Sequence, residues 1–163
     1  MKKISFSFAI LVAMSSASAP VHAETKEEWI ALGARIHGAF GPFIPVGIRI
    51  GLDAVDRLRA GPRDLIVSYQ NGAKSPCPCI ADGVMIATGT SPGQENLSID
   101  PTPPADGMFA IITIRHKRNG ATLRYSVSDE WLPKILAWRT MDASSRYDAA
   151  MNADNIFTLR REN

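Results

Sequence analysis

The sequence predicts an α+β fold: one domain with a mixed or antiparallel sheet and helices packed on it. Three observations favour this class. Two helical patterns follow residue 23, a long hairpin pattern occupies residues 107–128, and two further helical patterns come after it. Helices and strands that are grouped in separate runs, rather than alternating regularly, are typical of α+β domains.

The first 23 residues have the pattern of a secretory signal. Lys2 and Lys3 precede an apolar run over residues 4–14, and small residues end at Ala23. This order predicts cleavage after Ala23 and leaves residues 24–163 as the folded domain. The apolar run is too short to form a stable transmembrane helix, so we expect an exported, soluble protein and not an integral membrane protein. In a cell with an outer membrane, its compartment would be the periplasm.

The mature chain is expected to carry no net charge. Removing the signal leaves 163 − 23 = 140 residues, in which 18 − 2 = 16 basic residues balance 16 acidic ones. A nucleic-acid partner requires a clustered basic surface, and nothing in this sequence suggests one. A chain of this length is long enough to bury one hydrophobic core without disulfides or bound metal to stabilise it.

Two helices are expected at the start of the domain. Trp29, Gly33 and Ile36 recur at helical spacing, and Gly38 ends that pattern. Pro45 is well placed in the first turn of a second helix, which Gly61-Pro62 stops.

The second helix also has a face of small residues, formed by Gly47, Gly51 and Ala54. Glycine lowers helix stability, so two glycines four apart suggest that another backbone approaches closely. The expected partner is the sheet.

The remaining elements follow from local patterns. Residues 63–72 predict a buried strand, and residues 80–89 predict a short helix closed by Gly89. A loop rich in proline then leads to the hairpin, where Asn119-Gly120 favours a type I′ turn. Ser128 is the expected N-cap of an amphipathic helix to about residue 141. A further short helix over residues 144–152 leads to a polar tail.

The two cysteines, Cys77 and Cys79, are separated only by Pro78. In an oxidising compartment a disulfide is the first interpretation, but extended residues two apart lie about 6.5–7 Å from each other, at the upper edge of disulfide geometry. Closure would therefore need a bend at Pro78, and so short a loop would add little stability. A buried thiol and a metal-binding thiolate are the alternatives.

Two histidines remain in the mature chain. His116 lies in the hairpin beside Lys117 and Arg118 and is expected to be an exposed strand residue. His37 ends the first helix, where it could simply cap the helix carbonyls.

Two segments carry a resemblance to a known family. "IHGAFGPFIPVGIRIGLDAVDRL" and, about twenty residues later, "CIADGVMIATGTSPGQENL" resemble the FmdE-like family, which is related to a component of formylmethanofuran dehydrogenase. That family typically opens with His-Gly-His-x-Cys-Pro and a glycine-containing helix. Its second motif is Cys-x-x-Asp running into Thr-Gly-Cys-Thr-x-Gly-x-Gly-Asn-Leu. The resemblance covers residues 37–97.

The resemblance implies a metal site of histidine and cysteine in a cleft between the two motifs. Carried over by position, His37, Cys79 and Asp82 match the family's histidine, cysteine and aspartate. The matching loop positions are Thr88, Gly89, Gly93, Asn96 and Leu97. Ala39 replaces the second histidine, Gly41 and Thr90 replace cysteines, and Glu95 replaces a glycine. Most thiolate ligands of the family site are therefore missing.

Two kinds of site follow from these losses. One is a cleft lined by Phe40, Phe43 and Met85 that binds a small organic ligand. The other is a site for one metal ion through fewer, harder ligands, since oxygen donors suit hard cations. The side chains expected to contact a ligand are Phe40, Phe43, Thr88, Thr90, Ser91, Glu95 and Asn96.

The sequence thus predicts an exported accessory protein that binds a metal ion or a small molecule between the 37–45 loop and the 79–97 segment. A small redox or hydrolytic enzyme using Cys79 and His37 is one alternative. A non-catalytic interaction module with a degenerate site, which could form a homodimer through the glycine-faced helix, is another. Formylmethanofuran chemistry itself is not expected, because an exported chain would not meet the enzyme's other subunits.

Overall fold

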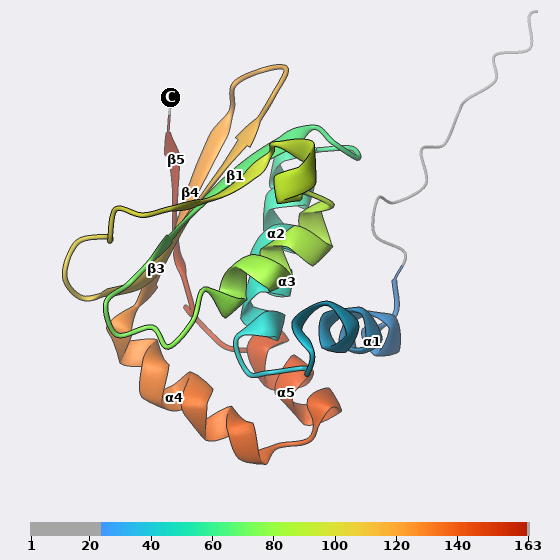
Figure 1. Ribbon diagram of the computed structural model, residues 1–163, viewed down its shortest axis with the longest axis vertical. Helices are drawn as coiled ribbons and strands as arrows, with labels where there is room; N and C mark the ends of the chain where they lie inside the picture. Colours follow the sequence, from blue (N-terminus) through green and yellow to red (C-terminus); the bar gives the residue numbers. More distant parts are fainter. Residues whose placement is uncertain (1–23, 163) are drawn as a thin grey trace, which may run out of the picture.

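A five-stranded mixed sheet forms the centre of the computed structural model, which describes residues 24–162 (Figure 1). The strand order is β2-β1-β3-β4-β5; β1 and β2 are parallel, and every other neighbouring pair is antiparallel. The predicted signal segment lies outside the described residues. The strands are β1 (Leu65–Asn71), β2 (Leu97–Asp100), β3 (Met108–His116), β4 (Thr122–Ser128) and β5 (Thr158–Glu162).

Five α-helices pack around this sheet within residues 24–162. Figure 1 shows α2 and α3 side by side across one face, α1 beyond them, and α4 and α5 at one end of the sheet. The predicted α+β single-domain fold is confirmed. None of these helices combines the length and the apolar character needed to cross a membrane. The helices are α1 (Lys26–His37), α2 (Ile44–Leu58), α3 (Cys79–Thr88), α4 (Leu132–Ala137) and α5 (Ala143–Met151).

The core lies between the sheet and the pair α2/α3. Along β1 burial alternates, with Leu65, Val67 and Tyr69 facing inward. In the register with β3, Val67 pairs with Ile114 and Tyr69 with Ile112, so the same face continues across the sheet. This period-two pattern places the apolar side of each strand under the helices.

The local signals for the first two helices are confirmed. Gly38 ends α1 with φ 88°, as expected, and the structure adds a reciprocal capping box of Thr25 and Glu28 at its start, which was not predicted. The first turn of α2 contains Pro45, as expected. These signals act between neighbours in the chain and therefore could be identified before any tertiary contact was known.

The small-residue face of α2 contacts a helix, so the expected contact with the sheet is wrong. A Cβ atom added at Gly47 would lie 2.8 Å from the Cα of Gly83 in α3 and would collide with the carbonyl oxygen of Ile80. Gly51 faces Ala87 one turn later. Two helices approach this closely only where both lack a side chain at the contact, and here Gly47 of α2 faces Gly83 of α3.

Two edge strands, β2 and β5, were not predicted. The β2 segment "LSID" has only four residues, and β5, "TLRRE", is charged and mostly exposed. Neither has the alternation of a half-buried strand. Backbone pairing to β1 and β4 places them in the sheet, and short or charged strands are common at sheet edges. The expected polar tail is therefore the fifth strand.

The hairpin of β3 and β4 is confirmed, but its turn is not type I′. Five residues, 117–121, connect the strands. Of the Asn119-Gly120 pair only Gly120 has a positive φ, 73°, whereas a type I′ turn needs positive φ at both positions. The longer loop is closed by a hydrogen bond from the Gly120 N–H to the His116 carbonyl at 3.0 Å.

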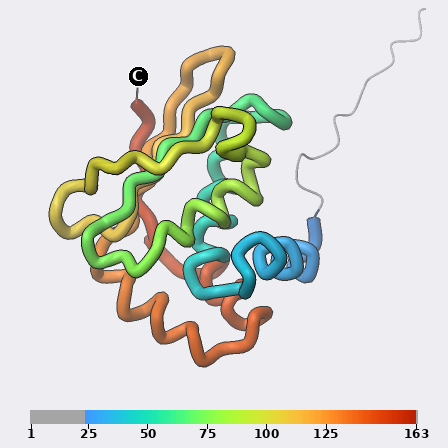
Figure 2. The backbone as a smooth tube through the Cα atoms, viewed as in Figure 1, coloured from blue at the N-terminus to red at the C-terminus, as the bar shows by residue number. Residues whose placement is uncertain are grey.

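The predicted helix after the hairpin is divided into three pieces. Ser128 caps the first turn, Asp129–Trp131, by accepting a hydrogen bond from the Glu130 N–H at 3.2 Å. Pro133 lies in the first turn of α4, and a final 3₁₀ turn covers Trp138–Thr140. The chain traced in Figure 2 then turns into α5 and returns along the sheet to β5.

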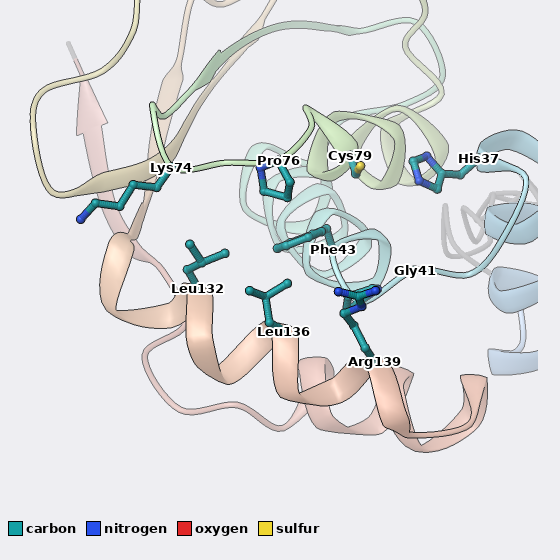
Figure 3. A pocket seen from close by; sticks show the side chains of 10 residues that line it. His37, Gly41, Phe43, Lys74, Pro76, Cys79, Leu132, Leu136 and Arg139 are labelled. Carbon is teal, nitrogen blue, oxygen red and sulfur yellow. The ribbon is translucent and has the colours of Figure 1, made fainter.

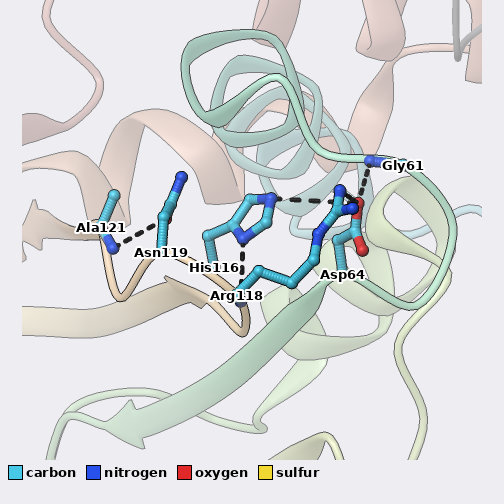
Figure 4. Close-up of polar contacts among 6 residues, drawn as sticks. All are labelled: Gly61, Asp64, His116, Arg118, Asn119 and Ala121. Carbon is cyan, nitrogen blue, oxygen red and sulfur yellow. Dashed lines mark hydrogen bonds and ion pairs between the residues drawn. The ribbon is translucent and has the colours of Figure 1, made fainter.

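His116 is buried, so its predicted exposure is wrong; only 4% of it is accessible. It pairs with Leu65 in the sheet and shares that residue's inward face. Figure 4 shows its ring between Arg118 and Asp64. The backbone N–H of Arg118 donates to His116 Nδ1 at 3.2 Å, and Asp64 Oδ2 lies 3.9 Å from His116 Nε2. The Gly61 N–H, assisted by Arg118 and His116, holds the pKa of Asp64 below its ordinary value. This cluster joins the start of β1 to the hairpin loop.

Candidate functional site

A cavity of about 460 Å³ lies between the end of α1 with the loop that follows it, the start of α3, and α4. Figure 3 shows Phe43 at its centre, with Cys79 and His37 on one side and Leu132 and Leu136 on the other. The volume falls in the range of small-molecule sites. The lining residues are His37, Gly41, Pro42, Phe43, Lys74, Pro76, Cys79, Leu132, Leu136 and Arg139.

His37 and Asp82 meet at the rim of this cavity. His37 Nδ1 lies 2.7 Å from Asp82 Oδ2, which joins the last turn of α1 to the first turn of α3. Both side chains are about one-third exposed. Because the carboxylate occupies Nδ1, Nε2 is the ring nitrogen that can face a ligand.

Cys77 and Cys79 form a disulfide. Their Cα atoms are 5.2 Å apart, within the normal range for a bridge, and Pro78 provides the bend with φ −77° and ψ 31°. Of the three interpretations of this pair, the structure therefore has the local disulfide, and no free cysteine exists among residues 24–162. Cys79 cannot act as a thiolate ligand in this state.

The residues present do not fit a thiolate metal site while the disulfide is intact. In the part of the chain that the structure describes, no group of three or more His, Cys, Asp or Glu side chains is arranged to hold a metal ion. His37 and Asp82 bond to each other, and the third predicted donor, Cys79, is oxidised. A metal ion at these residues stays a prediction.

Comparison with known proteins supports the family that the two motifs indicated. Residues 36–160 match the family model FmdE, which is described as "FmdE, Molybdenum formylmethanofuran dehydrogenase operon". The chain belongs to this family. The match extends well beyond residues 37–97 and takes in the hairpin, α4 and α5. No curated protein matches the sequence.

The predicted contact residues of this FmdE-family chain fall into two groups. Phe43 lines the cavity, together with His37 and Cys79. Phe40 instead packs under α1, where its ring contacts the position of Gly33, and only 5% of it is exposed. Met85, also expected in the cleft, does not line the cavity.

The polar residues of the second motif lie at the far end of α3. A ten-residue helix is about 15 Å long, so these side chains are well separated from Cys79. The Thr88 hydroxyl donates to the Val84 carbonyl and bonds to Thr90, 2.8 Å away. Asn96 Oδ1 accepts the Ser91 N–H at 2.8 Å and shapes the turn into β2. The last residue of this group, Glu95, is exposed with φ 55°.

The cavity wall formed by α4 was not predicted from the sequence. Leu132 and Leu136 are one helical turn apart, and Arg139 follows them on the same side of the cavity (Figure 3). The spacing signalled an amphipathic helix. Nothing local indicated that its apolar side faces the 41–43 loop.

The two charged side chains that line the cavity of the FmdE-family chain are basic, while the Asp82 carboxylate lies at its rim, bonded to His37. Lys74 and Arg139 line the cavity itself, and no carboxylate of the described residues does. Lys74 Nζ lies 2.9 Å from Asp129 Oδ2, so its charge is balanced. The Arg139 guanidinium makes no ion pair with any side chain in residues 24–162, and it is available to an anion.

Proposed function

We propose that this chain is an exported accessory protein of the FmdE family that binds a small organic anion in the cavity between the 41–43 loop, α3 and α4. Family membership and the apolar cavity support this proposal. The single observation that carries it is a largely apolar lining, built on Phe43, Leu132 and Leu136, with the guanidinium of Arg139 at its edge.

The lining suggests the form of the ligand. Phe43, which stacks on Phe109 with ring centroids 5.3 Å apart, gives a rigid aromatic floor. An aliphatic or aromatic body would fill the space, and a carboxylate would reach the guanidinium, which favours planar oxyanions. This proposal includes no catalytic step, because each of these lining residues is assigned to holding the ligand.

Calorimetry with 3-phenylpropionate and its charge-reversed counterpart 3-phenylpropylamine tests this binding on the oxidised mature chain. We expect the carboxylate to bind at least about tenfold more tightly than the amine. Leu136→Trp should fill the cavity, and Arg139→Gln should remove the anion contact; each should weaken carboxylate binding about tenfold.

The same helix offers matched controls outside the cavity. Ala137 and Lys134 are exposed and do not line it, so Ala137→Trp and Lys134→Gln should bind like the parent chain. Equal binding of the amine would contradict the anion preference. Binding of neither probe at millimolar concentration would favour an interaction module, with the homodimer as its first test.

A second candidate function is metal binding in the reduced state. The observation that favours it is the approach of His37 to Asp82, one helical turn after Cys79. A single thiolate, an imidazole and a carboxylate would form an incomplete site for one ion, with a ligand or water completing it.

Cys77→Ser frees Cys79 permanently and therefore tests the metal proposal without a reductant. We expect this variant to retain about one equivalent of Zn²⁺ by elemental analysis, and the double variant Cys77→Ser/His37→Ala to bind at least about tenfold more weakly. The disulfide-bonded parent should bind none. Equal zinc content in the single and double variants would exclude His37 as a ligand.

A further inference from the structure

We propose that the Cys77–Cys79 disulfide is a reactive group that exchanges with small anionic thiols entering the cavity. This activity shares the cavity with the proposed function but does not depend on the organic anion. Four features support it: the position of the bridge, its accessibility, its minor part in holding the fold, and the charge around it.

The disulfide contributes little to holding the fold together. Its loop contains only Pro78, so it removes little entropy from the unfolded chain. The segment is already held by other contacts: Ser75 Oγ donates to the Cys77 carbonyl at 2.8 Å, and the Ala81 N–H donates to the Pro78 carbonyl at 2.9 Å. The close packing of α3 on α2 at Gly83 positions the helix independently of the bridge.

The bridge can be reached from the cavity. Cys79 is one of the lining residues, beside Phe43 and Pro76, whereas Cys77 is not. Cys77 is partly exposed, whereas only 8% of Cys79 is exposed, so the cavity is the route to its sulfur atom. In this proposal an incoming sulfur atom approaches Cys79 from the cavity and the partly exposed Cys77 is the leaving group, since exchange requires access to the bridge.

The reaction consists of two exchanges. The thiolate of the entering thiol attacks Cys79 Sγ, the Cys77–Cys79 bond breaks, and its electron pair leaves on Cys77 Sγ, which takes up a proton. A second thiol then attacks the entering sulfur atom, and the electron pair of the mixed disulfide returns to Cys79 Sγ. Two small thiols are oxidised to one disulfide, and the protein disulfide is reduced to two thiols.

The charges near the cavity indicate which thiols should react fastest. Arg139 lines it and makes no ion pair within residues 24–162, whereas Lys74 is paired with Asp129 and the Asp82 carboxylate at the rim is bonded to His37. An anionic thiol is drawn to such a site and a cationic one is repelled. Mercaptoacetate and cysteamine are small thiols of opposite charge and therefore form a matched pair of probes.

The experiment measures how fast each probe opens the disulfide in the native mature chain and in the same chain denatured in urea. Samples are quenched, their free thiols are alkylated, and the products are counted by mass spectrometry. We expect the native rate to lie within about tenfold of the denatured rate, because Cys79 lines the cavity and Cys77 is partly exposed. The ratio of native to denatured rate should be larger for mercaptoacetate than for cysteamine. In Cys77→Ser, the disulfide form of mercaptoacetate should add once, at Cys79.

The Leu136→Trp variant identifies the route. It should slow the native reaction about tenfold, since the cavity is filled, and leave the denatured rate unchanged. An unchanged native rate would overturn entry through the cavity. A native disulfide that stays closed for hours, while the denatured chain opens in minutes, would overturn the proposal as a whole. Binding of 3-phenylpropionate is measured without any thiol, so either proposal can fail without the other.

Discussion

Gly47→Ala is expected to destabilise the folded chain by roughly 3 kcal/mol or more. The new Cβ would lie 2.8 Å from both the Gly83 Cα and the Val84 nitrogen and would collide with the Ile80 carbonyl oxygen. All three neighbours are backbone atoms of α3, so no side-chain rotation can relieve the contact. The helices must separate, which opens the packing of two largely buried elements.

Urea unfolding monitored by tryptophan fluorescence measures this loss. Gly93→Ala is the matched control, because the nearest atom to its added Cβ is Ser91 Oγ at 4.0 Å; its free energy of unfolding should change by less than about 0.5 kcal/mol. Gly51→Ala meets the Ala87 side chain at 2.6 Å and should also destabilise, though by less. A Gly47→Ala variant as stable as the control would mean that α2 and α3 are not in contact as described.

Arg146→Met is expected to lower the free energy of unfolding by roughly 2–4 kcal/mol and to abolish ligand binding in the cavity. This half-buried side chain of α5 donates to four carbonyl groups. Its Nε bonds to the Trp138 carbonyl at 3.1 Å, and Nη2 bonds to the carbonyls of Met141 at 2.7 Å and Arg139 at 3.2 Å. Its Nη1 bonds to the Phe40 carbonyl.

These bonds connect the two walls of the cavity. Phe40 belongs to the loop that contributes Phe43, and Arg139 closes the α4 wall. Removing the guanidinium leaves the carbonyls of Phe40 and Trp138, whose bonds are part-buried, without this donor and lets α4 move away from the loop. Loss of a donor to half-buried carbonyls costs more than the loss of an exposed ion pair.

Two further variants separate this role from a general effect of charge. Arg146→Lys keeps the charge but not the planar set of donors, so it should recover only a minor part of the stability. Arg160→Met, at an exposed position on β5, should be nearly neutral. Thermal unfolding and 3-phenylpropionate calorimetry provide the two measurements; full stability together with full binding in Arg146→Met would contradict this account.

The sequence by itself determined the elements whose signals are local. Pro45 in the first turn of α2, and Gly38 and Gly89 at helix ends, act between residues close in the chain. The two motifs at residues 37–97 were sufficient to indicate the family, because they combine residue type, order and separation. His37, Phe43 and Cys79 all belong to these motifs, but only the folded chain places them around one cavity.

Only the tertiary structure decided the rest, because those features depend on residues distant in the chain. The strands β2 and β5 exist through backbone pairing that their side chains do not signal. Burial of His116 follows from its register opposite Leu65, and the partner of Gly47 is a glycine 36 positions away in α3. The α4 wall and the charge of Arg139 reach the cavity because Arg146 holds α4, α5 and the Phe40 loop together. Local patterns set where each element begins and ends, and long-range packing sets which faces meet.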